Sequence, residues 1–245
     1  MKRNNKTALR QAQGGGEHSR TTALITGASG GIGREIAREL AKKGYRLALA
    51  YRSNKRAAAR LARACARLGA PEAFIVHCDI RNERSIRRAA RETVRRFGRI
   101  SVLINNAGVN VMKPLRKQSF REIDAQLDIN LGGCMKLTKM LLPHIDGTII
   151  NIASRAGKIA KPSMTAYCAT KFGVRGFTQS LALEEPALRV LSVNPDRVAT
   201  RMVGFRGRPP RDVARIVADV LDGKRTAASG ADIDLWKVLP DKAGR

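Results

Sequence analysis

The sequence predicts an α/β fold: one doubly wound parallel sheet of about seven strands with helices on both faces. Short apolar runs alternate with amphipathic helical patterns along the chain, as in successive strand–helix–strand units. The runs are apolar at successive positions, which is typical of strands buried on both faces of a parallel sheet. No linker and no internal repeat interrupts residues 22–236, so the units are expected to form a single domain.

The expected elements follow one another in the order that such a sheet needs. A glycine-rich turn follows the first strand, and the next helix runs to Lys43 with Gly44 as its C-cap. Gly69 and Gly98 end the following two helices in the same way. The expected strands are 22–26, 45–51, 73–77, 100–105, 147–153 and 188–194 with a weak one at 231–236, and the later helices are 119–144, 163–185 and 209–222.

Composition is that of an ordinary folded protein. The chain has 245 residues, 43% of them hydrophobic, which suffices for one substantial core. Residues 1–20 are polar and basic, so we expect a flexible leader ahead of a folded domain at residues 21–240. No apolar run approaches the roughly 20 residues that cross a bilayer, and the leader lacks the apolar middle of a secretory signal. A cytoplasmic protein without membrane contact is therefore expected.

The cysteines and histidines form no metal-binding pattern. The four cysteines include no Cys-x-x-Cys pair, and the three histidines lie in different segments. Because a metal site needs converging ligands, we expect no metal, and we interpret the cysteines as reduced thiols.

Charge is the unusual feature of the composition. The chain has 47 basic and 20 acidic residues, a net charge of +27, which attracts anions such as nucleotides, acidic carrier proteins and nucleic acid. Two sets of arginines recur at helical spacing: 56, 60, 63 and 67, and 84, 88, 91 and 95. Such lines are more often a solvated face than a binding site. Aromatic residues make up 4% of the chain, too few for a platform that stacks single strands, so nucleic acid is not the expected partner.

The turn after the first strand has the composition of a phosphate-binding loop. Residues 26–33 read TGASGGIG, and Gly27, Gly31 and Gly33 allow a tight turn and a close approach of the backbone to a pyrophosphate. Glycine also favours plain strand-to-helix turns, but the position between the first strand and the first helix favours nucleotide binding.

The end of the second strand indicates which dinucleotide is bound. An acidic residue there would accept hydrogen bonds from the ribose of NAD. The sequence has Arg52 instead, and a guanidinium suits the 2′-phosphate of NADP. NADP(H) is therefore preferred over NAD(H), the alternative being that Arg52 is one of many surface arginines.

Tyr167 and Lys171 stand four residues apart in a predicted helix and share one face. A phenol is a poor general acid–base at neutral pH, and a neighbouring ammonium is expected to lower its pKa towards the working range. Lys171 is also able to bind the nicotinamide ribose. Ser154, at the end of the fifth strand, lies where ligands bind in such sheets. The alternative, a solvated Tyr–Lys pair, is weakened by the glycine turn and this serine.

Four stretches taken together resemble the short-chain dehydrogenase/reductase family, in that family's order and spacing. They are TGASGGIG at 26–33, NNAG at 105–108, Ser154 in NIASRAG, and YCATK at 167–171, and the resemblance extends from Thr22 to about Thr200. It implies a Rossmann-type catalytic domain, active as an NADP(H)-dependent oxidoreductase that interconverts a carbonyl and a secondary alcohol. The 3-oxoacyl-carrier-protein reductases and the carbonyl reductases are the similar enzymes within the family.

The resemblance also implies a role for each matching residue. Asn130 matches the asparagine that holds a water in a proton relay, Ser154 orients the substrate carbonyl, and Tyr167 with Lys171 transfers the proton. Homodimers or homotetramers are the family's assemblies, with dimers formed through the two long helices. The implied cofactor contacts are Gly27, Ser29, Gly31, Ile32, Gly33, Arg52, Asp79, Ile80, Asn106, Ala107, Gly108, Val198 and Thr200, together with Tyr167 and Lys171.

The sequence departs from the family pattern after the sixth strand. Asp196 stands where the family commonly has glycine, and it is expected to add a negative charge beside the cofactor. The segment from Thr200 to the next helix is short, which predicts an open or shallow site. The C-terminal stretch lacks the glycine-rich ending of many tetrameric relatives.

Two functions remain at this point. The first is the NADP(H)-dependent enzyme, whose carbonyl or alcohol substrate is either free or bound to a carrier protein. The second is a binding protein that keeps the nucleotide fold and acts through its basic surface on nucleic acid or an acidic carrier. The complete set of Asn130, Ser154, Tyr167 and Lys171 favours the enzyme.

Overall fold

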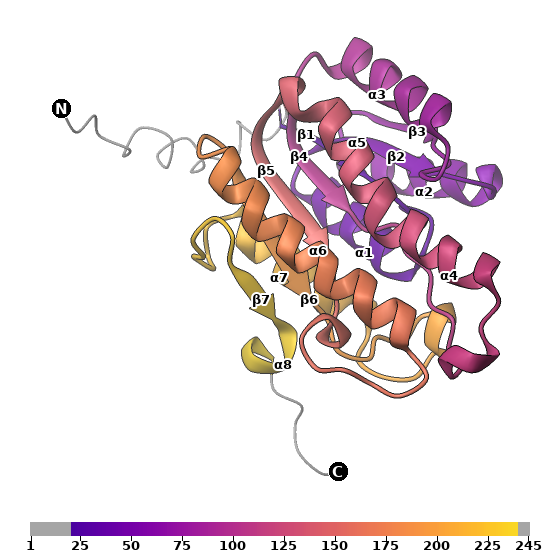
Figure 1. Ribbon diagram of the computed structural model, residues 1–245. Coiled ribbons are helices and arrows are strands. Elements are labelled where there is room, and N and C mark those ends of the chain that lie inside the picture. The colour runs from indigo at the N-terminus through magenta and orange to yellow at the C-terminus, as the bar shows by residue number, and fades with distance from the viewer. Residues whose placement is uncertain (1–20, 240–245) are drawn as a thin grey trace.

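The residues that the structure describes, 21–239, form a seven-stranded sheet in the order β3-β2-β1-β4-β5-β6-β7 (Figure 1). The structure is a computed structural model. Every neighbouring pair of strands is parallel, so the predicted doubly wound sheet is confirmed. The predicted leader lies outside the described residues. The strands are β1 (Thr22–Ile25), β2 (Arg46–Tyr51), β3 (Ala73–His77), β4 (Ile100–Asn105), β5 (Ile145–Ile152), β6 (Arg189–Asn194) and β7 (Asp232–Asp234).

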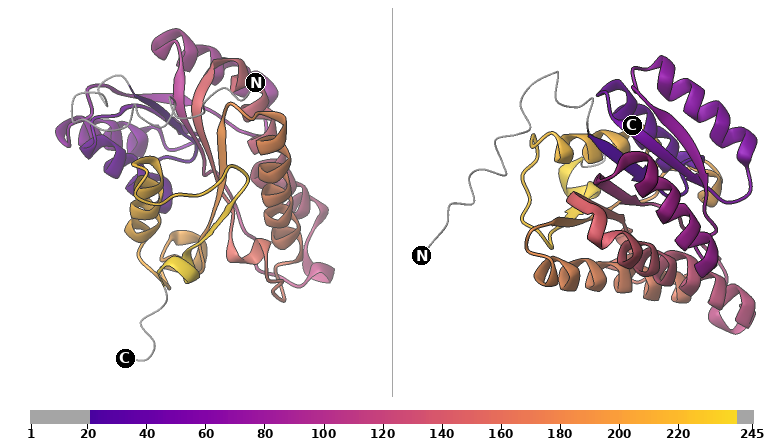
Figure 2. Two further views of the ribbon diagram at one scale, coloured as in Figure 1. Left: turned by 90° about the vertical axis from the view of Figure 1, so that its left-hand side faces the viewer. Right: turned by 90° about the horizontal axis from the view of Figure 1, so that it is seen from above.

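Helices cover both faces of the sheet, as the two further views in Figure 2 show. One face packs against α1, α2 and α7, and the other against α3, α5 and α6. The helices are α1 (Gly31–Lys42), α2 (Lys55–Arg67), α3 (Glu83–Phe97), α4 (Phe120–Leu127), α5 (Gly133–Leu141), α6 (Thr165–Glu184), α7 (Pro210–Leu221) and α8 (Leu235–Val238).

The central strands are buried on both sides because successive side chains point to opposite faces. In β1, Leu24 packs into the core under α3, α5 and α6, whereas Ile25 packs under α1, α2 and α7. In β4, Leu103 and Ile104 divide in the same way. The continuous apolar runs in the sequence thus reflect two cores, one on each face.

Side-chain caps start several of the helices where the sequence changes from apolar to polar. The side chains of Asn54 and Asn82 accept hydrogen bonds from the first turns of α2 and α3. Ser119 and Glu122 form a reciprocal capping box at the start of α4. Gly98 ends α3 with a φ of 76°, as its position in the sequence predicts.

Two predicted elements differ from the structure. The expected continuous helix over 119–144 is divided into α4, a π-helical turn at Asp128–Gly132, and α5. The expected strand at 231–236 is shorter, because Leu235 and Trp236 belong to the short helix α8. Neither difference changes the sheet.

The strand order reverses direction between β1 and β4. The chain leaves β1 towards β2 and leaves β4 towards β5, so a crevice opens at the carboxyl ends of these two strands. Sheets of this kind bind their ligands in that crevice.

Candidate active site

A large cavity of about 1020 Å³ lies at the carboxyl ends of the central strands. Of the residues predicted to bind cofactor or substrate, all line this cavity except Gly33 and Asn130. The predicted residues in its wall are Gly27, Ser29, Gly31, Ile32, Arg52, Asp79, Ile80, Asn106, Ala107, Gly108, Ser154, Tyr167, Lys171, Val198 and Thr200. Segments that are up to about 170 residues apart in the chain thus meet in one place.

Close packing and hydrogen bonds from Asn106 hold the glycine turn after β1 in a fixed shape. Gly27 has a φ of +60°, and a Cβ on Gly33 would lie 2.6 Å from the Gly27 carbonyl oxygen, so neither position accommodates a side chain. The Asn106 Nδ2 donates to the carbonyl oxygens of Thr26 (2.8 Å) and Gly27 (3.2 Å). The Thr26 hydroxyl accepts from the Asn106 amide at 2.9 Å. The turn is a pre-formed cradle for phosphate at the N-terminus of α1.

At the β2–β3 end of the cavity, an ion pair leaves Arg52 without an acidic partner. The Asp79 carboxylate accepts hydrogen bonds from Arg81 at 3.0 Å and 2.6 Å. These bonds hold the pKa of Asp79 below its usual value, with a smaller contribution from the charge of Arg52. Within residues 21–239, Arg52 forms no ion pair, and this exposed residue lines the cavity.

Ser154 and Tyr167 meet at the opposite end of the cavity, beyond β5. The Ser154 hydroxyl oxygen accepts a hydrogen bond from the Ala156 amide at 3.1 Å, at the start of a short 3-10 turn. Tyr167 lies in the first turn of α6 and is 8% exposed. Burial raises the pKa of Tyr167 to about 12, and a hydrogen bond with the Ser154 side chain opposes that rise. The expected lowering of this pKa is therefore wrong.

The position of Lys171 explains why it does not lower the pKa of Tyr167. Its Nζ lies 5.7 Å from the centre of the tyrosine ring and donates to the Ile152 carbonyl oxygen at 2.8 Å. The amine thus lies over the ring face rather than beside the hydroxyl. Because Lys171 is itself buried, desolvation lowers its pKa to about 8.

Asn130 lies behind the cavity wall, in the π-helical turn between α4 and α5. Its side chain pairs with the backbone of Val109, accepting from the amide at 2.8 Å and donating to the carbonyl oxygen at 2.9 Å. It also donates to the Thr170 hydroxyl on α6 at 3.1 Å. Asn130 therefore joins the segment after β4 to the helix that holds Tyr167 and Lys171. Local π-helical geometry is frequent at functional sites.

Asp196 does not add an uncompensated charge to the site, contrary to expectation. The Arg208 guanidinium binds its carboxylate with two hydrogen bonds, of 2.8 Å and 3.1 Å. Both side chains are largely buried, 9% exposed for Arg208 and 11% for Asp196. A bidentate pair of this kind is geometrically specific as well as charge-neutralising.

The segment after β6 closes against the glycine turn. A Cβ on Gly31 would lie 2.6 Å from the Thr200 Cγ2, so these two predicted cofactor contacts touch across the cavity. Val198 is 5% exposed and forms a backbone bridge with Arg208. The two residues that match the family pattern thus border the cavity between β1 and β6.

Part of the cavity wall was not predicted from the sequence. Much of it comes from the loops after β5 and β6, which have no periodic pattern. The arginines among these residues had no distinguishing signal in a chain with 47 basic residues. The additional lining residues include Arg155, Lys161, Met164, Arg197, Arg201, Met202 and Arg206.

Two expected absences concern metals and membranes. Within residues 21–239, no group of three or more histidine, cysteine, aspartate or glutamate side chains converges on a point where a metal ion could bind. The absence of a metal stays a prediction. In the same part of the chain, no helix combines the length and the hydrophobicity that a membrane span needs.

Comparisons with known proteins agree on one family. The short chain dehydrogenase family matches residues 21–209. The D-threitol dehydrogenase of Mycolicibacterium smegmatis is 38% identical over 186 residues, which cover 74% of this chain and 71% of that protein. The 3-oxoacyl-[acyl-carrier-protein] reductase FabG of Staphylococcus aureus is 37% identical over 177 residues, 71% of each protein.

A solved structure agrees with these sequence matches. A dehydrogenase/reductase from Sinorhizobium meliloti has a TM-score of 0.82 and 25% identity, covering 94% of this chain and 97% of its own. The sheet order, the cavity at the switch point and these likenesses lead to one conclusion. The chain belongs to the short-chain dehydrogenase/reductase family and is an NAD(P)-dependent oxidoreductase that acts on a carbonyl or alcohol group.

Proposed function

We propose that the protein uses NADP(H) to interconvert a carbonyl compound and a secondary alcohol, with Tyr167 as general acid and base. One observation carries the proposal: Ser154, Tyr167 and Lys171 line one end of a cavity whose other end holds the glycine turn and Arg52. The glycine cradle and the unpaired guanidinium fit a pyrophosphate and a 2′-phosphate. When bound, NADPH supplies a hydride to the carbonyl carbon.

Tyr167 supplies the proton that the carbonyl oxygen takes up. Because burial raises its pKa to about 12, the phenol is protonated at neutral pH. The Ser154 oxygen accepts from the Ala156 amide, so its own hydrogen is available to Tyr167 or to the substrate oxygen. Two donors therefore converge where negative charge develops in reduction. In the oxidation direction, Tyr167 takes the proton back.

Lys171 and Asn130 support this proton transfer. The Lys171 amine, which lies over the tyrosine ring, is proposed to bind the nicotinamide ribose and so to position the cofactor beside Tyr167. Asn130 is proposed to hold the water of the proton relay. Both residues approach Gly108. A Cβ added to Gly108 would lie 3.3 Å from the Asn130 Oδ1 and 3.8 Å from the Lys171 Nζ, so the two side chains lie on the same side of the site.

The first prediction tests the tyrosine. Tyr167→Phe removes the hydroxyl and keeps the ring that packs in α6. NADPH oxidation with a panel of ketones should fall roughly 100-fold to 10,000-fold, because a positioned general acid contributes about that factor. NADPH binding, followed by its fluorescence, should remain. If the variant turns over every ketone as fast as the parent protein, Tyr167 is not the proton donor.

The second prediction tests the preference for NADP(H). Arg52→Ala removes the guanidinium that is proposed to bind the 2′-phosphate. Its affinity for NADPH should fall roughly 10-fold to 100-fold, the range expected for charge-assisted hydrogen bonds. Its affinity for NADH should change little. Both affinities are measured by fluorescence titration, and equal losses for the two cofactors would contradict the proposed 2′-phosphate contact of Arg52. Arg56→Ala, on the outer face of α2, is the matched control.

The proposed substrate is a small carbonyl or alcohol compound, free or attached to a carrier protein. The named activity of the Staphylococcus aureus relative and the net charge of +27 support the carrier-bound form. We also propose a cytoplasmic location. All four cysteines are buried free thiols, which suits a reducing compartment.

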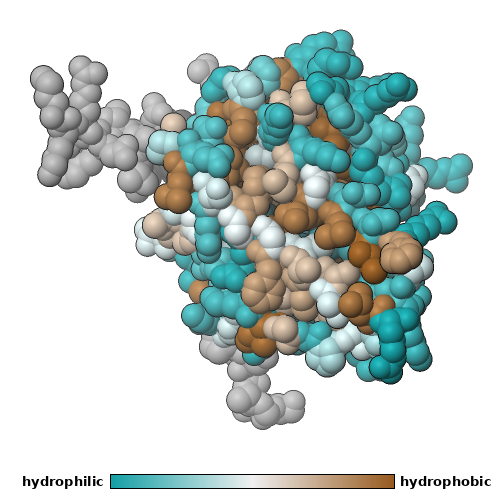
Figure 3. Space-filling model, viewed as in Figure 1, coloured by the Kyte–Doolittle hydropathy of each residue, from teal (hydrophilic) through white to brown (hydrophobic). Residues whose placement is uncertain are grey.

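Self-association as a homodimer or homotetramer is proposed as well. The exposed positions of α6 from Thr165 to Leu183 hold no charged residue, which is unusual in so basic a chain. Phe172 and Leu183 on α6 and Phe120 on α4 are 45%, 84% and 87% exposed. Figure 3 shows apolar side chains gathered on this face of the molecule. An exposed apolar patch of this kind marks an interaction site.

Residues 21–240 are proposed as the dinucleotide-binding catalytic domain. The family matches residues 21–209, and the structure continues the same sheet to β7. The cofactor contacts and the proposed proton donor all lie within these limits.

A further inference from the structure

The carbonyl end of the cavity is lined by cations without acidic partners. Two acidic side chains line the cavity, and each already pairs with an arginine outside it: Asp79 with Arg81 and Asp196 with Arg208. Apart from Arg52 and Lys171, five cations line the cavity, and within residues 21–239 no ion pair involves any of them. These cations are Arg155, Lys161, Arg197, Arg201 and Arg206.

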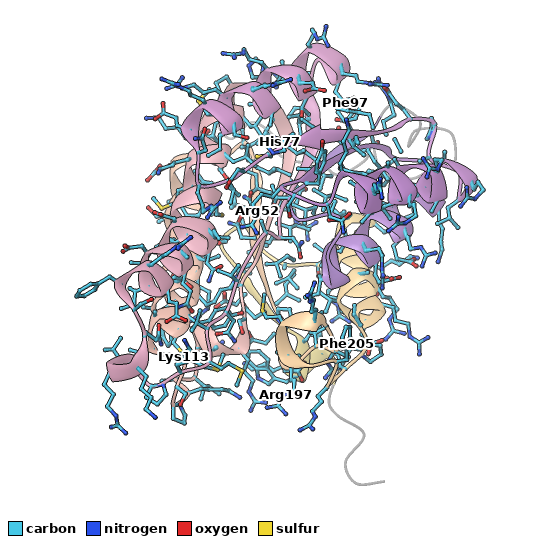
Figure 4. The ribbon with its side chains drawn as sticks, turned by 90° about the vertical axis from the view of Figure 1, so that its right-hand side faces the viewer. Arg52, His77, Phe97, Lys113, Arg197 and Phe205 are labelled. Atoms are coloured by element: carbon cyan, nitrogen blue, oxygen red, sulfur yellow. The ribbon has the colours of Figure 1, made fainter. Side chains whose placement is uncertain are left out.

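Strand order separates these cations from the position of the 2′-phosphate. They come from the segments after β5 and β6, on one side of β1, whereas Arg52 follows β2 on the other side. Figure 4 shows Arg52 apart from Arg197 and Phe205, which belong to the loop after β6. Arg201 is next to Thr200, which touches the glycine turn, so Arg201 is within the region of the cofactor. Arg197, Arg206 and Lys161 are not accounted for by the cofactor.

The loop that holds Arg197 and Arg206, residues 196–208, is fixed at its base. The Asp196–Arg208 ion pair joins its two ends, and two backbone bonds repeat the link: the Arg208 amide to the Arg197 carbonyl oxygen (2.9 Å) and the Ala199 amide to the Arg208 carbonyl oxygen (2.8 Å). Gly207 has a φ of +111°, and a Cβ there would lie 2.2 Å from the Arg197 carbonyl oxygen. These contacts fix the backbone at the base of the loop, where Arg197 and Arg206 are attached.

Asp196 is the acidic residue of this loop, and its charge is already neutralised by Arg208. It does not offset Arg197 and Arg206. The net charge of the loop at the cavity is thus positive, and a guanidinium binds a carboxylate or phosphate in a planar fork.

We propose that loop 196–208 binds an anionic group of the substrate, so that the enzyme prefers carbonyl compounds that carry a carboxylate or a phosphate. Arg197 and Arg206 are the specificity-determining residues, together with Lys161 of the segment after β5. Asp196 and Arg208 are positioning residues that act by fixing the loop. The inference rests on the proposed function, because it names the substrate class of the same site.

Matched pairs of substrates test the preference. Acetoacetate is compared with methyl acetoacetate, and dihydroxyacetone phosphate with dihydroxyacetone, by NADPH oxidation. The charged member of at least one pair should have a kcat/KM roughly tenfold or more above its neutral partner. The pair that shows the preference tells a carboxylate site from a phosphate site. Equal values within both pairs would overturn the inference while leaving the proposed function supported.

Variants then locate the site. In Arg197→Ala/Arg206→Ala, the ratio of kcat/KM between the charged and neutral substrates should fall roughly tenfold or more, mainly through KM. Arg211→Ala is the matched control, because this exposed arginine lies in the first turn of α7 and does not line the cavity. If the control lowers the ratio as much as the double variant does, general surface charge is responsible and the loop is not the site.

The ion pair between Asp196 and Arg208, which fixes the base of the loop, has its own test. Asp196→Asn keeps the size of the side chain and removes its charge. It should raise KM for the charged substrate several-fold more than it lowers kcat, because the loop that presents Arg197 and Arg206 is loosened. A fall in kcat with KM unchanged for both members of a pair would show that the ion pair acts on the chemical step or on stability instead.

A binding measurement separates failure of this inference from failure of the proposed function. Calorimetry with benzoate and benzamide, on the protein saturated with NADPH, needs no turnover. Benzoate should bind roughly tenfold or more tightly, and the double variant should abolish the difference. If no carbonyl is reduced but benzoate still binds at the loop, the proposed reaction fails and the anion site stands. Equal binding of the two compounds would contradict the anion site.

Discussion

Tyr167 and Lys171 show how one buried environment shifts two pKa values in opposite directions. Burial disfavours the charged form of each group, so the pKa of the tyrosine rises to about 12 and that of the lysine falls to about 8. The phenol therefore keeps its proton at neutral pH, whereas the amine begins to lose its charge just above it. Desolvation, rather than the mutual attraction of the two groups, sets the protonation state of each.

The cost of that arrangement gives a prediction for Lys171. A lysine pKa of about 8 lies below the usual 10.5, so folding penalises the ammonium below pH 8, and the penalty disappears as pH rises from 8 to 10.5. Lys171→Met should abolish turnover yet raise the free energy of unfolding at pH 7 by roughly 1–2 kcal/mol, and by less at pH 10.

Denaturant unfolding at both pH values measures this effect. Lys136→Met on the exposed side of α5 serves as control and should change stability little at either pH. A clear loss of stability in Lys171→Met at pH 7 would show that the hydrogen bond to Ile152 outweighs the desolvation of the amine.

At the scale of elements, β7 is the shortest strand of the described sheet and is held by ionic contacts. Asp232 lies between Arg175 of α6 and Ser192 of β6, with the Arg175 Nε 3.0 Å from both carboxylate oxygens. Burial alone would raise its pKa, but hydrogen bonds from Arg175, Ser192 and Asn194 lower it to about 2. A short edge strand is thereby fixed to the helix that holds Tyr167.

A pH-dependent loss of stability follows for Asp232. Because its folded pKa is depressed, its contribution is complete above about pH 4 and is lost as pH falls towards 2. Asp232→Asn should lower the free energy of unfolding by about 2 kcal/mol at pH 7 and by less at pH 3. Denaturant unfolding at the two pH values checks this. A deficit of the same size at both would mean that packing, and not charge, holds the strand.

At the scale of the whole molecule, charge and hydrophobicity are segregated. The arginine lines of α2 and α3 are exposed and, within residues 21–239, unpaired, whereas the outward face of α6 is free of charge up to Leu183. Solvation explains the first surface. We propose that contact with a second copy of the chain accounts for the second, because an apolar stripe gains most by excluding water.

The assembly gives a prediction for Leu183. Leu183→Glu introduces a charge within the proposed interface and should shift the protein from a dimer or tetramer towards a monomer in sedimentation velocity. Phe205→Glu is the control, since Phe205 is 72% exposed but lies on the loop after β6. An unchanged mass for Leu183→Glu, or a parent protein that is monomeric, would exclude this interface.

Much of the fold and the predicted site could be read from local patterns. Apolar runs at strand spacing and capped helices specify the elements, and the fixed hand of strand–helix–strand units specifies the sheet. Cavity-lining residues such as Gly27 and Arg52 are predictable because each lies just after a strand, and the carboxyl ends of parallel strands meet at one edge. The π-helical turn around Asn130 was missed, because it depends on contacts with Val109 and Thr170 rather than on sequence period.

The sequence by itself determined the element order, the family and fifteen of the residues that line the cavity. The tertiary structure decided the electrostatics: that Asp196 is neutralised by Arg208, that Lys171 binds Ile152 and leaves the phenol of Tyr167 protonated, and that cations gather at the carbonyl end. The physical reason is the range over which each effect acts. Patterning is local along the chain, whereas desolvation and charge pairing depend on neighbours in space that no spacing in the sequence specifies.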